Sequence, residues 1–316
     1  MRKRFGRIAN LAGLMIALPA IYLFFCYFKP SFRGLTNLET IARQSVVTIL
    51  VSLGLTYVIV AGGIDLTVGS VAALSGVIIA LVLKAGHPPM VAALAGIGVG
   101  ALAGLISGGL ITRLKVVPFI VTLGGLEMFR GAAKGFSHEQ TVYPPSTSLN
   151  NLLESLDKDE KWKIFPIGVW ITILLMFVTG LALRYTRFGR HVVAVGSNEQ
   201  AARLCGVPVQ RVKLAVYVIS GSLAGLAGLM SFSRLTVGDP TVDIGLELDG
   251  IAAAVIGGAS LSGGEGTIFG SVLGALIMAT LRSGASQWGL PNWVQEMVTG
   301  AIIVLAVALD RFRKRG

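Results

Sequence analysis

The chain has 316 residues, of which 53% are hydrophobic and only 14% are charged. This composition excludes an ordinary soluble domain, in which about a quarter of the residues carry a charge. The net charge of +11 does not indicate a nucleic-acid partner, because 16 of the 27 Lys and Arg residues gather in four short windows, 1–7, 112–115, 184–213 and 310–316. Long apolar runs separate these windows, so we predict an all-α, polytopic membrane helix bundle that sits in a lipid bilayer.

The apolar runs predict about ten transmembrane helices in a single transmembrane domain, residues 1–316. The predicted spans are 8–28, 41–61, 66–83, 90–111, 117–133, 164–184, 213–232, 248–262, 267–284 and 293–309. A cytoplasmic N-terminus places all four basic windows and both termini on the cytoplasmic side, as the positive-inside rule requires. The acidic connection 134–163 and the four tryptophans then lie at the outer face. Two of the spans, 66–83 and 248–262, are short enough to be re-entrant or broken segments.

A break interrupts the apolar sequence between the second and third spans. Gly62 and Gly63 carry no side chain and favour a turn. Asp65 then brings a carboxyl group to membrane depth, where a charge costs about 2.5–3.5 kcal/mol and usually faces a cavity or marks a functional site. One interpretation is a tight turn in which Asp65 caps a helix that begins at Leu66. The other is a segment that lines a transport pathway, and the two interpretations are compatible.

Glycines recur at a spacing of four in three segments, which puts them on one face of a helix. They are Gly96, Gly100, Gly104 and Gly108, then Gly221 and Gly225, and finally Gly266, Gly270 and Gly274. Such faces let helix backbones approach closely, so we predict packing within this chain, with a dimer interface as the alternative. A different glycine-rich stretch, GGASLSGGEG at 257–266, is too flexible for a regular span and predicts a bend between the last helices.

The longest basic window is predicted to hold a short helix with a stop signal at each end. Ser197 and Gln200 have the spacing of a capping box, which predicts a helix over Asn198–Cys205. Gly206 has the position of a C-terminal glycine, and Pro208 prevents the helix from continuing. A helix this short needs a packing partner. That partner is either this chain's own spans or a groove on a cytoplasmic protein.

Several motifs of enzymes and nucleotide-binding proteins are absent from the sequence. It contains no G-x-x-x-x-G-K-S/T phosphate-binding loop, so any ATP that drives the protein must be bound by a separate chain. H-E-x-x-H and G-x-S-x-G are also missing, and Cys26 and Cys205 are far apart and form no C-x-x-C pair. We therefore expect no catalytic residue, no metal site and no cofactor in this chain.

Three stretches of the sequence resemble one family of transport proteins. GGIDLTVGSVAALSG (62–76), GSNEQAARLCGVPVQRVK (196–213) and LDGIAAAVIGGASLSGGEGTIFGSVLGA (248–275) are similar to the membrane permease subunits of monosaccharide ATP-binding-cassette (ABC) importers of the ribose, xylose, arabinose and galactofuranose type. The resemblance runs from about Leu35 to Asp310. The motif GGIDL favours a sugar permease, whereas the IGG-x-S-L-x-GG-x-G run is shared with branched-chain amino-acid permeases.

The resemblance implies a subunit of an importer in the bacterial inner membrane, with both termini in the cytoplasm. Its implied partners are a second permease copy in a homodimer, ABC ATPase subunits that carry ATP and Mg, and a periplasmic sugar-binding protein that docks on the outer loops. The ATPase subunits would bind the cytoplasmic loop 185–212. The implied translocation-pathway residues are Gly62, Gly63, Asp65, Gly69 and Ser70. The implied ATPase-coupling residues are Gly196, Asn198, Glu199, Ala201, Ala202 and Gly206.

Three other functions stay open. An ion-coupled secondary sugar transporter would use Asp65 and Glu127 to carry protons or sodium. The alternative for Glu127 is an ion pair with Arg130, which lies three residues further along the same helix face. A branched-chain amino-acid ABC permease shares part of the motif pattern. A membrane-embedded enzyme would need a nucleophile or a set of metal ligands, and the sequence offers neither.

Overall fold

The structure is a computed structural model that describes residues 2–155 and 164–315. These residues form α-helices, the short 3₁₀ helices η1 (Pro30–Arg33) and η2 (Asn150–Leu152), and an isolated antiparallel bridge between Val142 and Gly238. The α-helices are α1 (Arg2–Phe28), α2 (Leu35–Val60), α3 (Val68–Lys84), α4 (Pro89–Arg113), α5 (Pro118–Ser137), α6 (Ile167–Tyr185), α7 (Arg187–Ser197), α8 (Glu199–Leu204), α9 (Val209–Leu235), α10 (Leu246–Ile256), α11 (Ile268–Gln287) and α12 (Asn292–Arg315). The predicted all-α fold is confirmed.

Six of these helices, α1, α2, α4, α6, α9 and α11, are long and apolar enough to cross a membrane. The predicted polytopic membrane bundle is therefore confirmed, whereas the number of ten spans is not. Each of the ten predicted spans coincides with a helix, but α3 has 17 residues and α10 only 11. At a rise of 1.5 Å per residue, α10 is about 16 Å long, roughly half the thickness of the hydrocarbon core.

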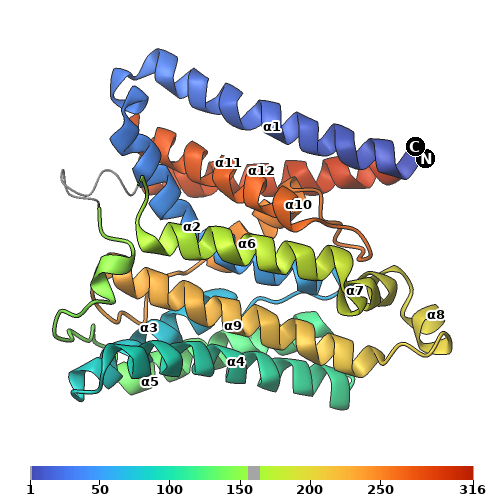
Figure 1. Ribbon diagram of the computed structural model, residues 1–316, viewed down its shortest axis with the longest axis horizontal. Helices are drawn as coiled ribbons and strands as arrows, with labels where there is room; N and C mark the ends of the chain where they lie inside the picture. The colour runs from blue at the N-terminus through green and yellow to red at the C-terminus, as the bar shows by residue number, and fades with distance from the viewer. Residues whose placement is uncertain (1, 156–163, 316) are drawn as a thin grey trace.

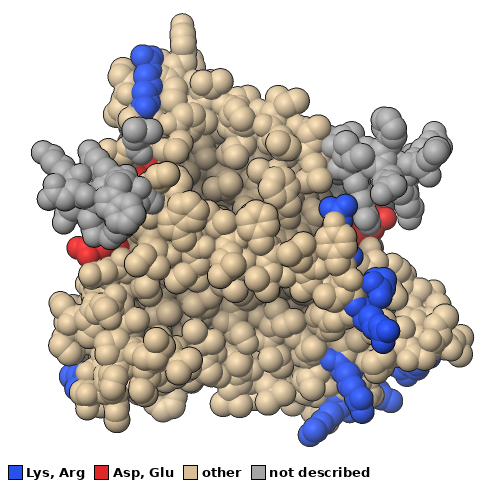
Figure 2. Space-filling view, in the orientation of Figure 1, with Lys and Arg blue, Asp and Glu red and all other residues tan. Residues whose placement is uncertain are grey.

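The ends of the bundle differ in chemical character from its middle. Figure 1 shows α7 and α8 at the same end of the bundle as the start of α1 and the end of α12. On the face seen in Figure 2, charged side chains lie toward the ends, and an uncharged belt covers the middle. A surface that faces lipid has this pattern, because charges are costly at membrane depth. Of the features expected at the outer face, Asp157, Asp159, Glu160 and Trp162 lie outside the described residues.

Two helices form the centre of the bundle. α9 packs against α2, α3 and α4, and α2 contacts α10 and α11 in addition. In an 18-residue window within α2, 83% of the residues are buried, which is the environment that a helix with apolar side chains on every face requires. Most of the buried side chains of these two helices belong to one continuous core, which includes Leu50, Val58, Val216 and Tyr217. Any group held between α2 and α9 is therefore shielded from both water and lipid.

The glycine stripes of α4 and α9 face each other. A Cβ atom on Gly100 would overlap the carbonyl oxygen of Gly221 and would lie 2.7 Å from Gly225 Cα. A Cβ atom on Gly104 would likewise lie 2.9 Å from the carbonyl carbon of Tyr217. In the same way, Gly274 on α11 leaves no room for a side chain beside α10, where a Cβ atom would lie 2.9 Å from Ala253 C. The predicted packing of small residues within the chain is confirmed.

This contact predicts the effect of a side chain on α4. Gly100→Val places a branched side chain against the backbone of α9, which cannot move aside, and such overpacking costs about 1–3 kcal/mol. We expect a lower midpoint of thermal unfolding in detergent than for the wild-type protein. Gly98→Val is the matched control, because no atom lies within 4 Å of a Cβ at that position on the same helix. Equal midpoints of thermal unfolding for the two variants would contradict this packing.

Candidate functional site

The predicted break between the second and third spans follows a helix end of a defined type. Gly62 has φ +81, in the left-handed region where glycine is favoured. The N–H groups of Gly62 and Gly63 donate hydrogen bonds to the carbonyl oxygens of Ile59 and Val58, each at 2.9 Å. This is the Schellman pattern, which satisfies the last carbonyl groups of α2. Residues 61–67 then run without helical structure until α3 begins at Val68.

Asp65 anchors this break to α9. Its side chain is buried, and Oδ1 accepts hydrogen bonds from the N–H of Thr67 at 3.0 Å and from Thr67 Oγ1 at 2.7 Å. Oδ2 accepts a hydrogen bond from Ser220 Oγ at 2.8 Å. The predicted cap on a helix starting at Leu66 is wrong, because the carboxylate binds an N–H two residues ahead and the helix begins only after Thr67. The carboxylate holds a turn together and joins it to a neighbouring helix.

One end of the segment 61–67 lies deep in the bundle, and its other end lies near the surface of the bundle. Ser220 is eleven residues beyond the start of α9 at Val209, which corresponds to about 16 Å along that helix. A Cβ atom on Gly54 of α2 would lie 2.8 Å from Ser220 Cα, so α2 passes Asp65 at the same level. Gly62, by contrast, is exposed and lies beside the end of α7. Residues 61–67 therefore lead from the α7–α8 end of the bundle into its interior.

Three chain segments meet around a group of glycines, Gly62, Gly196, Gly263 and Gly264, which we call the glycine junction. They come from the end of α2, the end of α7 and the predicted bend, which is confirmed as the connection between α10 and α11. The N–H of Gly264 donates a hydrogen bond to Val60 O at 2.8 Å. A Cβ atom on Gly196 would overlap that same oxygen, and one on Gly263 would lie 3.0 Å from Gly62 Cα. The junction thus exists only because none of these residues has a side chain.

The short helix predicted in the basic window is α8. A second helix, α7, precedes it and was not predicted from the sequence. Asn198 caps α8, because its Oδ1 accepts a hydrogen bond from the N–H of Ala201 at 2.9 Å. Ser197 is the last residue of α7, and its hydroxyl donates to Val193 O, so the predicted cap at Ser197 is wrong. The predicted stop is confirmed, since Gly206 has φ +79 and ends the helix.

α8 has a packed face and an exposed face. Ala202 is buried, whereas Leu204 is 90% exposed, so this helix carries an apolar side chain on its outer face. Glu199 accepts hydrogen bonds from Lys213 at 2.6 Å and from Arg203 at 3.1 Å, and so ties α8 to the first turns of α9. The hydrogen bond from Lys213, together with the positive charges of Lys213 and Arg203, lowers the pKa of Glu199 below its ordinary value. Ala202 therefore packs on this chain's own helices, whereas Leu204 points away from them.

The structure separates the five predicted pathway residues into two groups. Gly62 and Gly63 lie at the glycine junction or next to it, while Asp65, Gly69 and Ser70 are buried. The Ser70 hydroxyl donates a hydrogen bond to Thr67 O at 2.8 Å. A Cβ atom on Gly69 would overlap the backbone oxygen of Asp243 and the side chain of Glu247. The start of α3 therefore touches the loop 236–245 and α10. None of the five residues lines the cavity described next.

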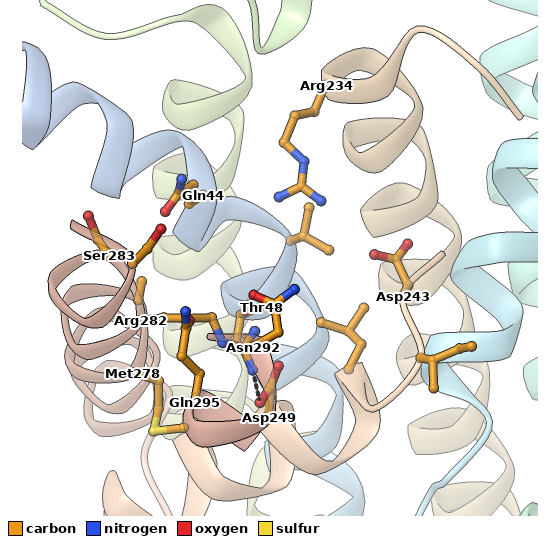
Figure 3. A pocket seen from close by; sticks show the side chains of 15 residues that line it. Gln44, Thr48, Arg234, Asp243, Asp249, Met278, Arg282, Ser283, Asn292 and Gln295 are labelled. Atoms are coloured by element: carbon orange, nitrogen blue, oxygen red, sulfur yellow. Dashed lines mark hydrogen bonds and ion pairs between the residues drawn. The ribbon is translucent and has the colours of Figure 1, made fainter. Parts of the chain in front are cut away.

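A polar cavity of about 680 Å³ lies toward the other end of the bundle from α8. Its lining residues come from α2, the end of α9, the loop that follows, α10, α11 and the start of α12. They are Gln44, Val47, Thr48, Arg234, Asp243, Ile244, Leu246, Asp249, Met278, Ala279, Arg282, Ser283, Ser286, Asn292 and Gln295. Figure 3 shows the ion pair between Asp249 and Arg282 on one side of this space and Arg234 reaching toward it from the end of α9.

The sequence analysis did not single out this cavity, although a signal for it was present. Asp249 and Arg282 are charged residues in otherwise apolar predicted spans, and such residues usually mark functional sites. Arg130 was expected to pair with Glu127, but it donates hydrogen bonds to Pro240 O at 2.8 Å and Val242 O at 2.7 Å. It thereby braces the loop that forms one wall of the cavity. Among the described residues, no group of His, Cys, Asp or Glu side chains is placed to hold a metal ion.

Comparison with known proteins identifies similar chains. A model of the family described as branched-chain amino acid transport system, permease component, matches residues 37–307. The ribose import permease protein RbsC of Escherichia coli K12 is 35% identical over 296 residues, which cover 94% of this chain and 92% of that protein. RbsC of Bacillus subtilis is 36% identical over 98% of this chain and 95% of its own length. The L-arabinose transport system permease protein AraH of Escherichia coli K12 is 34% identical over 98% of this chain and 93% of its own length. No solved structure matches the chain.

The close approach at the glycine junction predicts the effect of a single methyl group. In Gly196→Ala, the Cβ atom overlaps Val60 O and lies 2.7 Å from Gly264 N, so the Gly264–Val60 hydrogen bond is lost. A buried group left without its partner costs about 1–3 kcal/mol, and we expect a lower midpoint of thermal unfolding in detergent. Gly180→Ala is the control, since its Cβ would have only ordinary contacts, the nearest at 3.7 Å. If both variants melt like the wild-type protein, the junction is not tightly packed.

Proposed function

The chain belongs to the family of branched-chain amino acid transport system permease components, and on that premise we propose that it is the transmembrane permease subunit of a bacterial ABC importer for a monosaccharide. The observation that carries this proposal is the similarity to permeases named for ribose and L-arabinose along nearly the whole of both chains. Relatives named for sugars favour a pentose or hexose over a branched-chain amino acid as the substrate. The chain is then a transport subunit rather than an enzyme.

The importer requires partners that supply energy and substrate. ATP and Mg are bound by separate ATPase subunits, and a periplasmic sugar-binding protein delivers the substrate to the outer loops. A second copy of this chain completes the permease as a homodimer in the inner membrane. The shared position of α8, the start of α1 and the end of α12 supports a topology in which both termini are cytoplasmic. We retain ten spans in one domain, residues 1–316, with α3 and α10 as its short members.

We assign ATPase coupling to α8. Leu204, 90% exposed, is an apolar side chain on a helix whose other face is held to the bundle by Glu199. An exposed apolar residue on a short, capped helix suits insertion into a groove of a cytoplasmic partner. Arg203, Pro208 and Arg211 border a shallow depression beside it, which extends the surface available for docking. Gly196 lies near the end of α7, Asn198 and Ala201 form the cap of α8, and Gly206 ends α8.

The glycine junction connects this docking helix to the proposed pathway. Gly196 precedes α8 by three residues and packs directly on Val60 O at the end of α2. A shift of α8 on ATP binding would therefore displace the end of α2, the break at 61–67 and the bend between α10 and α11 together. Binding energy moves such a bundle between two states only as far as it favours one of them. Segments without helical structure can absorb the change in backbone angles.

We keep Gly62, Gly63, Asp65, Gly69 and Ser70 as the proposed pathway segment and assign Asp65 a positioning role within it. Both carboxylate oxygens of Asp65 already accept hydrogen bonds, and the residue is only 1% exposed. A group in this state holds the unwound backbone in place and offers no open oxygen to a sugar or an ion. This arrangement supports an ATP-driven importer over an ion-coupled secondary transporter that would carry its ion on Asp65.

Reconstitution tests the function together with the role of Asp65. We expect the tagged chain to purify with an ATPase subunit and its proteoliposomes to take up sugar only with ATP and the binding protein, without an ion gradient. Asp65→Asn keeps an acceptor for Thr67 and gains an N–H donor for Ser220 Oγ, so uptake should stay within about twofold. Asp65→Ala leaves the hydroxyl groups of Thr67 and Ser220 without their partner. Each such group costs about 1–3 kcal/mol of stability, so this variant should abolish uptake. Uptake driven by an ion gradient and lost in Asp65→Asn would instead identify a secondary transporter.

Leu204 provides a separate test of the docking surface. Leu204→Glu replaces the exposed apolar side chain with a charge, and we expect co-purification of the ATPase to fall by roughly tenfold or more, as for a buried anchor residue. Thermal stability of the permease should not change, because the side chain has few contacts within the chain. Leu114→Glu is the matched control, a leucine 64% exposed in another predicted cytoplasmic window. Equal ATPase recovery with the two variants would exclude α8 as the docking helix.

A further inference from the structure

The polar cavity toward the outer end of the bundle has the size and position of a site for a small molecule. Its volume of about 680 Å³ lies within the range of ligand pockets, roughly 300–1,000 Å³. Arg234 is in the last turn of α9 and Asn292 is the first residue of α12, so the cavity lies at helix ends remote from α8. In the proposed topology this end faces the periplasm, from which the substrate arrives.

The charged groups on the cavity wall balance one another. Arg234 and Arg282 supply two cations, and Asp243 and Asp249 supply two anions, so the site carries no net charge with which to attract an ion. The amide side chains of Gln44, Asn292 and Gln295 add both donors and acceptors. A balanced set of planar donors and acceptors suits a neutral ligand with many hydroxyl groups, since each hydroxyl both donates and accepts a hydrogen bond.

The Asp249–Arg282 ion pair on the cavity wall uses only part of the hydrogen-bonding capacity of Arg282. Arg282 Nη2 lies 2.8 Å from Asp249 Oδ1, and the Arg282 side chain is 50% exposed, whereas that of Asp249 is 9% exposed. Asp249 thus holds the guanidinium in place through one nitrogen (Figure 3), and the half-exposed Arg282 side chain lines the cavity. A fixed guanidinium is well suited to donate hydrogen bonds to two neighbouring oxygen atoms of a ligand.

Asp243 shapes the loop that forms one wall of the cavity. Its Oδ1 accepts a hydrogen bond from Ser231 Oγ at 2.9 Å, which ties the loop to α9, and its Oδ2 is buried with no partner among the described residues. The residue has φ +58, in the left-handed region that Asp tolerates better than most residues other than glycine. Because Oδ2 is not exposed to the cavity, Asp243 positions the wall and does not itself bind a ligand hydroxyl.

We propose that this cavity is the site in which the permease receives the monosaccharide, with Arg282 and Asp249 binding its hydroxyl groups and Met278 and Leu246 contacting its apolar C–H face. The inference rests on the proposed function and adds to it a substrate site that lies apart from the segment Gly62–Ser70. The sugar would leave the binding protein, enter this cavity and pass inward when the glycine junction moves.

The test uses proteoliposomes that contain the permease, its co-purified ATPase and the sugar-binding protein, with a radiolabelled panel of aldopentoses and aldohexoses that includes ribose and arabinose. The variant Asp249→Asn/Arg282→Gln removes both charges but keeps groups of similar shape that can bond to each other. We expect uptake to fall by about tenfold or more, as expected when hydrogen bonds to charged groups are lost. ATPase activity stimulated by the loaded binding protein should stay within about twofold, because docking and coupling are untouched. Glu127→Gln, an exposed carboxylate outside the cavity, is the control and should transport normally.

The outcomes separate this inference from the function on which it rests. Unchanged uptake by the double variant would overturn the cavity as the substrate site and leave the importer intact. A wild-type assembly that imports no sugar in the panel would overturn both. If the double variant does not assemble, Ser286→Trp decides the question, because it fills the cavity from an exposed position. Loss of uptake with retained ATPase activity then supports the site, and normal uptake refutes it.

Discussion

A helix that unwinds inside a membrane must find hydrogen-bond partners within the protein, because lipid offers none. At residues 61–67 these partners come from four sources. Gly62 and Gly63 close the end of α2, Asp65 binds the backbone and hydroxyl of Thr67, and Ser220 on α9 binds the second carboxylate oxygen. Tyr217 adds a hydrogen bond to Ile64 O at 3.1 Å. The short α3, the loop contacts around it and the path from the α7–α8 end into the bundle all depend on this set of bonds.

Close contact between glycines is the second physical basis of the structure, and it serves two purposes. Along α4 and α9 it brings two long helices together at backbone distance, which gives a stable wall to one half of the bundle. At the glycine junction it brings the end of helix α7 together with two connections, the one that follows α2 and the one between α10 and α11, where Gly264 N–H binds Val60 O. The first contact resists movement because it extends along whole helices. The second joins segments that can change their backbone angles, and it is there that the docking helix α8 meets the interior.

The charged groups inside the bundle therefore fall into two classes. Asp65 is saturated with hydrogen bonds and holds the backbone, whereas the cavity side chains retain unused bonding capacity. Arg130 belongs to the first class, because it binds two carbonyl groups of the loop 236–245. That loop carries Asp243, so Arg130 on α5 holds the segment that forms one wall of the cavity. The separation explains why a carboxylate in the most recognisable motif does not line the cavity that best suits a neutral sugar.

The sequence by itself determined the all-α membrane class, the approximate positions of the long helices, the break at Gly62, the stop at Gly206 and the glycine faces, because these depend on neighbours within a few residues, but it did not reveal α7. It did not determine which residue would cap α8, since Ser197 and Asn198 both carry a suitable side chain and only the extent of α7 selects Asn198. The partners Asp65 and Ser220 are 155 residues apart, and Asp249 and Arg282 are 33 apart. Only the tertiary structure brings such groups together, because helix packing, not local preference, decides which faces meet.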